Sequence, residues 1–207
     1  MSTLVDLVQD LYRAKSYRFF TQGAYNLNLF GVRRAQDGVN LFNDVLGCVY
    51  RPAADAPLKL ERWPGTTDPG SYYLRQPMNS GGTAIVVPGQ YPGLWELATH
   101  KGQPAFRQVG DVTVYRDGDR DNELDMDPGT KRTGVFAING HRAGAASKLV
   151  DRWSAGCQVW SRAADLERAL ELGRAQLKAH PTWKATFTYT LFDAADQPAA
   201  LALFEGL

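Results

Sequence analysis

The string Ser154-Ala155-Gly156-Cys157 lies a short distance after His141, so that a thiol follows an imidazole in the chain. Cys157 is one of only two cysteines, and His141 is one of only three histidines. A thiol becomes a strong nucleophile when a base takes its proton, and imidazole suits that task near neutral pH. The Gly156-Cys157 step can turn sharply and direct backbone N–H groups at an oxyanion. These residues predict an acyl-transfer site. Cys157 is its nucleophile, His141 its base and acid, the amides of Gly156 and Cys157 its oxyanion donors, and Ser154 the residue that orients the turn.

Three further residues are candidates for substrate binding. Arg142 follows the predicted base and can bind a substrate carboxylate through two parallel hydrogen bonds. His100 follows a predicted strand and can contact substrate or add a second polar group to the cleft. Trp153 precedes the motif and can line its rim. Each also has a plain structural interpretation, as a surface arginine, an exposed loop histidine and a packed tryptophan.

The elements that must position these residues follow from the spacing of apolar side chains. Apolar residues at helical spacing predict a helix over residues 3–16, and a stretch rich in Ala, Leu and Glu predicts another over 163–179, capped by Ser161. Alternating or short apolar runs predict strands over 25–32, 39–50, 58–60, 82–87, 93–98, 106–115, 134–139, 158–160 and 186–192. From Ser71 to the motif the pattern is nearly all β, and the strand over 134–139 leads into His141. We therefore expect one α+β domain over residues 1–207, mainly antiparallel, with a catalytic core over about 70–162 and flanking N- and C-terminal helices.

Composition limits the remaining possibilities. A net charge of +1 with interspersed charges predicts neither nucleic acid nor a charged membrane as partner. No apolar run is long enough to span a bilayer, and residues 1–20 lack the apolar core of a signal peptide. We therefore expect synthesis in the cytoplasm, with export or release by other machinery. Two cysteines make no disulfide framework, and Cys48 in an apolar run is expected to be a small buried hydrophobe.

The sequence predicts neither a metal nor a cofactor. The acidic run over 117–125 resembles a calcium-binding loop, but Asn122 stands where that loop needs glycine and Pro128 where it needs glutamate. A solvated hairpin loop is the better interpretation. The three histidines, His100, His141 and His180, lie far apart in the chain and lack cysteines at zinc-ligand spacing.

The motif resembles that of the L,D-transpeptidase catalytic domain family, which has the YkuD-like fold. That family carries a histidine, a loop of variable length and then Ser/Thr-His-Gly-Cys, which correspond here to His141, Ser154, Gly156 and Cys157. The resemblance covers about residues 70–162 and is specific mainly at the motif. It implies a mostly β, sandwich-like domain that needs no cofactor, whose cysteine is acylated by a peptidoglycan stem peptide at the bond after meso-diaminopimelate.

The chain departs from that family in two places. Ala155 replaces the histidine of the motif, and residues 158–160 lack an arginine that commonly follows the cysteine. The string Ser-Ala-Gly-Cys-Gln is similar to a divergent branch found in phage-borne and bacterial proteins.

Three functions therefore stay open. The first is transpeptidation on peptidoglycan peptides. The second is hydrolysis by an L,D-carboxypeptidase or endopeptidase, acting in the periplasm or cell wall as a phage lytic factor or a secreted antibacterial toxin. The third is a non-catalytic binding or structural phage protein. The acceptor and the oligomeric state do not follow from the residues.

Overall fold

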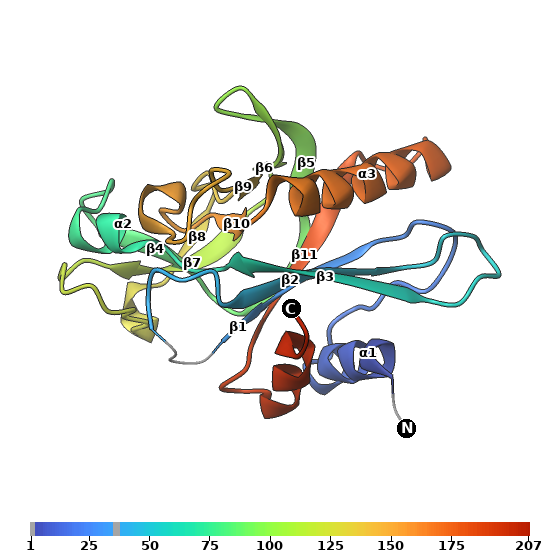
Figure 1. Cartoon of the computed structure of the whole chain (residues 1–207), viewed down its shortest axis with the longest axis horizontal. Coiled ribbons are helices and arrows are strands. Elements are labelled where there is room, and N and C mark those ends of the chain that lie inside the picture. Colours follow the sequence, from blue (N-terminus) through green and yellow to red (C-terminus); the bar gives the residue numbers. More distant parts are fainter. Residues whose placement is uncertain (1–2, 35–37) are drawn as a thin grey trace.

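The main sheet of the computed structural model, which describes residues 3–34 and 38–207, closes into a barrel (Figure 1). Its strand order is β1 (Asn28–Arg33), β11 (Thr186–Asp193), β5 (Gly89–His100), β6 (Gln103–Gln108), β9 (Gly140–Arg142), β10 (Gln158–Trp160), β3 (Lys59–Thr66) and β2 (Asp44–Tyr50). The barrel closes because β2 also pairs with β1. A smaller sheet contains β4 (Thr83–Val86), β7 (Val112–Asp117) and β8 (Arg132–Gly134). Among the described residues, only β1 with β11 and β9 with β10 pair in parallel, so the fold is α+β and mostly antiparallel, as expected.

The two long helices cover opposite sides of the strands β1, β2 and β3 (Figure 1). Helix α1 (Leu4–Ala14) begins at Thr3, whose hydroxyl accepts from the N–H of Asp6 while the Asp6 carboxylate accepts from the N–H of Thr3. The apolar face of α1 packs together with η3 (Pro198–Phe204) against one side of β1 and β2. Helix α3 (Ala163–Ala179) buries Leu166 and Leu170 in the core on the other side.

The barrel interior is aromatic. The rings of Trp95 and Tyr189 have centroids 4.4 Å apart, and Phe106 lies 5.5 Å from both Trp95 and Phe187. Such ring pairs add stability beyond the area that they bury. The indole N–H of Trp95 donates to the carbonyl oxygen of Ile138 at 2.9 Å, which ties the core to the segment that precedes His141.

Several predicted elements are confirmed. The helix over 163–179 has the predicted bounds, and the first helix, the strand over 158–160 and the last strand differ from prediction by two residues or fewer at each end. Cys48 is fully buried, and both cysteines are free. None of the helices in the described ranges is long and apolar enough to cross a membrane.

Other expectations were wrong. The predicted strand over 106–115 is two strands, because the N–H groups of Val109 and Gly110 both turn back to the carbonyl of Leu94. Residues 71–75 form helix α2 (Ser71–Arg75) instead of β structure. Ser161 does not cap α3, because its hydroxyl donates to the carbonyl of Pro64. The strand over 58–60 extends to Thr66.

The barrel includes strands beyond the expected catalytic core of about residues 70–162. Strands β1, β2, β3 and β11 lie outside residues 70–162, yet they form half of the barrel. Removing them would expose unpaired strand edges on β5 and β10. Residues 70–162 are therefore not a separate structural unit within the chain.

Candidate active site

Parallel pairing of β9 with β10 brings the histidine and the cysteine to one edge of the barrel. Val159 pairs with His141, and the N–H of Gln158 donates to the carbonyl of Asn139 at 2.9 Å. Parallel strands begin at the same edge, so Cys157, directly before β10, lies beside the residues that precede β9. His141 is therefore within a strand, and the strand predicted over 134–139 is instead irregular backbone after β8.

The turn before Cys157 is held by the side chain of Ser154. Its hydroxyl donates to the carbonyl of Cys157 at 2.8 Å and accepts from the N–H of Gly156 at 3.1 Å. These contacts give Ser154 an orienting position in the turn. They also engage the N–H of Gly156, so this group is not free to bind an oxyanion. The expected pair of donors is thereby reduced to one.

The remaining donor is the N–H of Cys157. The side-chain Nε2 of Gln158 donates to the carbonyl of Gly156 at 3.3 Å. The side-chain Oε1 of Gln158 accepts from the Tyr189 hydroxyl at 2.6 Å, which holds this side chain in place. In a trans peptide the carbonyl and the N–H point in opposite directions, so fixing the Gly156 carbonyl also fixes the N–H of Cys157. Within the part of the chain that the structure describes, this N–H has no acceptor.

The sulfur of Cys157 lies against backbone of the segment before β9. Its thiol donates to the carbonyl of Ala137 at 3.4 Å. Burial raises the pKa of the Cys157 thiol to about 11, although the N–H of Asn139 and the charge of Lys101 both favour the thiolate. The thiol is therefore protonated at neutral pH.

The imidazole of His141 has one nitrogen bound and the other available. Its Nδ1 lies 3.0 Å from the carbonyl oxygen of Arg142, which can only accept, so Nδ1 carries the proton and Nε2 keeps its lone pair. Burial lowers the pKa of His141 to about 4, with His100 and Lys101 acting in the same direction. Thiol and imidazole are therefore both neutral at rest, and the thiol would have to lose its proton before or during any attack by the sulfur.

This resting state predicts a specific pH dependence for alkylation of Cys157. We expect the rate with iodoacetamide to rise through pH 9 and above without a plateau near neutrality, because the thiolate fraction grows until the pH reaches the raised pKa. Peptide mass mapping between pH 5 and 10 separates Cys157 from Cys48, whose thiol also has a pKa raised by burial. A plateau with a midpoint below pH 7, lost in His141→Gln, would instead reveal a thiolate–imidazolium pair at rest.

A second histidine packs against the first. The rings of His100 and His141 have centroids 4.8 Å apart and planes inclined by 23°. His100 is the last residue of β5 and pairs with Gln103 across the turn Lys101-Gly102, where both residues have positive φ. Two positive φ values in a two-residue hairpin are typical of a type I′ turn, which sets the register of β5 and β6.

Cys157 and both histidines line one hollow of about 590 Å³. Trp153, 41% exposed, lines it too and packs closely over Gly144. Arg142 does not line this hollow. Arg142 lines a second, adjoining hollow of about 300 Å³. The two hollows share His100, His141 and Trp153 among their lining residues.

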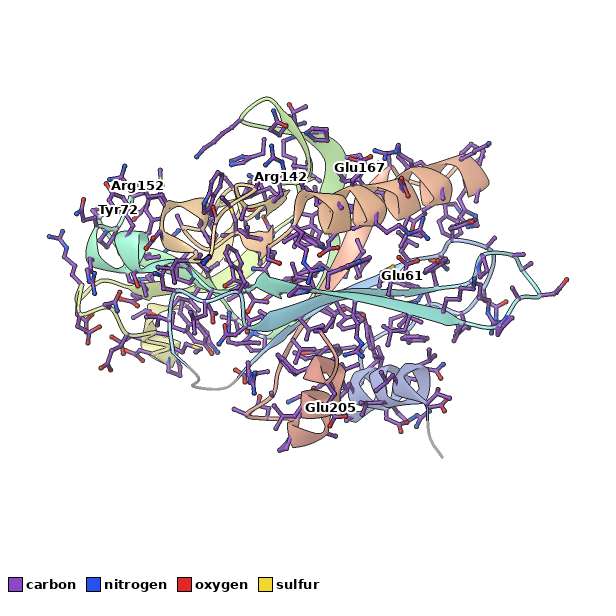
Figure 2. The ribbon with its side chains drawn as sticks, viewed as in Figure 1. Glu61, Tyr72, Arg142, Arg152, Glu167 and Glu205 are labelled. Atoms are coloured by element: carbon purple, nitrogen blue, oxygen red, sulfur yellow. The ribbon has the colours of Figure 1, made fainter. Side chains whose placement is uncertain are left out.

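Three cations of the larger hollow were not predicted: Lys101, Arg116 and Arg152. The guanidinium of Arg152 lies 4.0 Å from the centroid of the Tyr72 ring in α2, and that of Arg116 lies 4.6 Å from the centroid of the Phe136 ring. Figure 2 shows Arg152 beside Tyr72, with Arg142 further along toward α3. No local pattern marks these cations, because their sequence neighbours belong to three different elements.

Gln108 and Asn139 are two more contributors that the sequence does not reveal. The Gln108 side chain accepts from the N–H groups of Phe136 and Ile138 and donates to the carbonyl of Gly134, so it holds the irregular segment beside Cys157. The Asn139 amide contacts the ring of His100. Neither amide stands out in the sequence, because Gln108 ends β6 and Asn139 precedes β9 without any local motif, and buried amides with partners are common in proteins.

The acidic loop contains the side chains best placed to bind a metal ion in the described ranges. Carboxylate oxygens of Asp117, Asp119 and Asp125 all lie within 4.8 Å of one another. Burial raises the pKa of Asp117 to about 6, and the neighbouring acids contribute in the same direction. Apart from Asp117, which ends β7 and is buried, the acidic residues of this loop are exposed, as expected for a solvated loop between the paired strands β7 and β8.

Comparison of the chain with family models, with curated proteins and with solved structures gives no match. Arguments about function therefore rest on the motif and on the geometry of the cleft.

Proposed function

We propose that the protein is a cysteine-dependent acyltransferase that acts on peptidoglycan stem peptides, as an L,D-transpeptidase-like enzyme. One observation carries the proposal: His141 and Cys157 line the same hollow, and the bond between Nδ1–H of His141 and the Arg142 carbonyl leaves Nε2 of His141 unprotonated. A neutral imidazole in that tautomer is a general base.

The proposed reaction begins when the sulfur of Cys157 attacks the acyl carbonyl while Nε2 of His141 takes the thiol proton. The N–H of Cys157 donates to the developing oxyanion. The C–N bond then breaks, the imidazolium returns its proton to the leaving amine, and a thioester remains on Cys157. An acceptor amine or water then attacks the thioester while His141 takes its proton; the C–S bond breaks, and the imidazolium returns the proton to the sulfur, which restores the free thiol.

The proposed substrate class rests on the motif and on the charge of the cleft. Lys101, Arg116 and Arg152 line the hollow beside Cys157, and its lining within residues 3–34 and 38–207 contains no carboxylate. Peptidoglycan stem peptides carry free carboxylates, so this surface suits them. His100, Trp153 and, from the adjoining hollow, Arg142 are proposed substrate contacts.

Intact-protein mass spectrometry tests the proposal. The protein is incubated with a stem tetrapeptide ending in meso-diaminopimelate–D-alanine, with and without a second D-amino acid. We expect a tripeptide adduct on Cys157 with release of D-alanine. Exchanged peptide then indicates transfer, and trimmed peptide alone indicates hydrolysis. Cys48→Ala is the matched control and should keep the adduct. Absence of both adduct and product would contradict the proposal.

A non-catalytic binding protein is the second candidate, and the raised pKa of the Cys157 thiol favours it. In that case the cationic hollow binds a carboxylate-bearing peptide without turnover. The same incubation discriminates, because binding measured by calorimetry would persist in Cys157→Ala while no adduct forms on the wild-type protein.

A further inference from the structure

The stacked histidines differ in the partners of their Nδ1 atoms. Nδ1 of His141 faces a carbonyl oxygen and must donate. Nδ1 of His100 lies 3.1 Å from Nδ2 of Asn139, and an amide nitrogen only donates, so this ring nitrogen must accept. The two rings are therefore opposite tautomers, with the proton of His100 on Nε2.

The orientation of the Asn139 amide is itself determined. Its Oδ1 accepts from the backbone N–H of Gln108 at 2.9 Å, which leaves Nδ2 directed at His100. Asn139 is only 4% exposed, so water cannot easily replace either bond. A flipped amide would place Nδ2 against the Gln108 N–H, with two donors facing each other.

The charges around the pair do not favour a second proton. Lys101 adjoins His100, Arg142 and Arg152 line the smaller hollow with both histidines, and Arg116 and Cys157 line the larger one with them. Neither hollow has a carboxylate among its described lining residues. Burial and the charge of Lys101 lower the pKa of His100, which therefore is neutral at pH 7.

We propose that the hydrogen bond from Asn139 to Nδ1 of His100 keeps His100 from taking the thiol proton, so that His141 accepts it. His100 then stays neutral and serves as a positioning residue packed against the base. His141 can take the thiol proton on Nε2 while its bond to Arg142 persists. His100 can take a proton only on Nδ1, which would break its bond to Asn139 and set two donors face to face. The catalytic consequence rests on the proposed function, whereas the assignment of the protons does not.

Two-bond ¹H–¹⁵N correlation spectra of the imidazole rings test the assignment on the wild-type protein without substrate. We expect His100 to be the Nε2–H tautomer and His141 the Nδ1–H tautomer at pH 7, with signals assigned by comparison with His100→Gln. An Nδ1–H tautomer or a protonated ring at His100 would overturn the proposal. This measurement needs no variant of Asn139, so it decides even if such a variant fails to fold.

Asn139→Asp tests the consequence. The carboxylate can still accept from the Gln108 N–H, but it also accepts from Nδ1–H of His100. We expect it to raise the pKa of His100 by about 1 to 3 units and to slow formation of the Cys157 adduct roughly tenfold or more at neutral pH. His100→Gln removes the competing ring. The double variant Asn139→Asp/His100→Gln should therefore form the adduct at nearly the rate of the single variant His100→Gln.

The two arms separate the possible failures. If Asn139→Asp slowed adduct formation equally in the wild-type protein and in His100→Gln, the proton assignment would be overturned. An unchanged pKa of His100 in Asn139→Asp would overturn it too. Spectra with the expected tautomers from a protein that never forms an adduct would instead count against the proposed function and leave the assignment intact.

Discussion

Replacing Cys157 with alanine is expected to lower the rate of acyl transfer by at least about 10⁴-fold, because Cys157 supplies the one thiol among the described residues that line the hollow with His141. The thiol donates a hydrogen bond to the Ala137 carbonyl and lies near the N–H of Asn139, and the residue is only partly exposed. The thermal unfolding midpoint should therefore change little. Product formation from the stem tetrapeptide, followed together with thermal unfolding, measures both effects.

Cys48→Ala provides the control for that experiment. Cys48 is fully buried in the barrel core, so its replacement should cost stability but leave transfer intact. Transfer at the wild-type rate by Cys157→Ala would show that the nucleophile lies elsewhere and would remove the basis of the proposed mechanism.

Replacing Gly156 with alanine is expected to reduce the free energy of unfolding by about 3 kcal/mol or more. Gly156 has a φ of +119°, which L-amino acids rarely adopt. A Cβ atom there would lie 2.5 Å from the carbonyl oxygen of Ala84 and 3.1 Å from the Cδ1 of Ile138. Because the nearest atom belongs to the backbone of β4, the turn must move, and the N–H of Cys157 moves with it. Urea unfolding and adduct formation should both be affected.

Gly102→Ala separates backbone strain from the steric clash. Gly102 also has a positive φ, +76°, but no heavy atom lies within 4 Å of an added Cβ. We expect a loss of only about 1 kcal/mol there. Similar losses at both glycines would mean that the contact with β4 is not what restricts position 156.

The elements that matched prediction are those whose signals are local. Helix α1 begins where Thr3 and Asp6 form a capping box, and its apolar residues recur at helical spacing. Helix α3 lies in a run of strong helix formers. The strand β10 and the strand β11 also follow from short apolar patterns that need no distant partner.

The errors have a common cause, which is competition from distant partners. The segment over 134–139 is apolar enough for a strand, but Gln108 takes the N–H groups of Phe136 and Ile138 that a strand would use for pairing. The hydroxyl of Ser161 is a good cap by type, but the carbonyl of Pro64 engages it. Such outcomes depend on residues far along the chain, which propensity does not describe.

The sequence by itself determined the candidates for a nucleophile, a base and an orienting turn. The types and spacing of His141, Ser154, Gly156 and Cys157 suffice for that choice, because a nucleophile, a base and a turn have recognisable side chains. Only the tertiary structure decided the tautomers and the protonation states of these side chains. The parallel pairing of β9 with β10, burial in the cleft and the bonds from Arg142 and Asn139 set tautomers and pKa values, since these depend on groups brought close by folding.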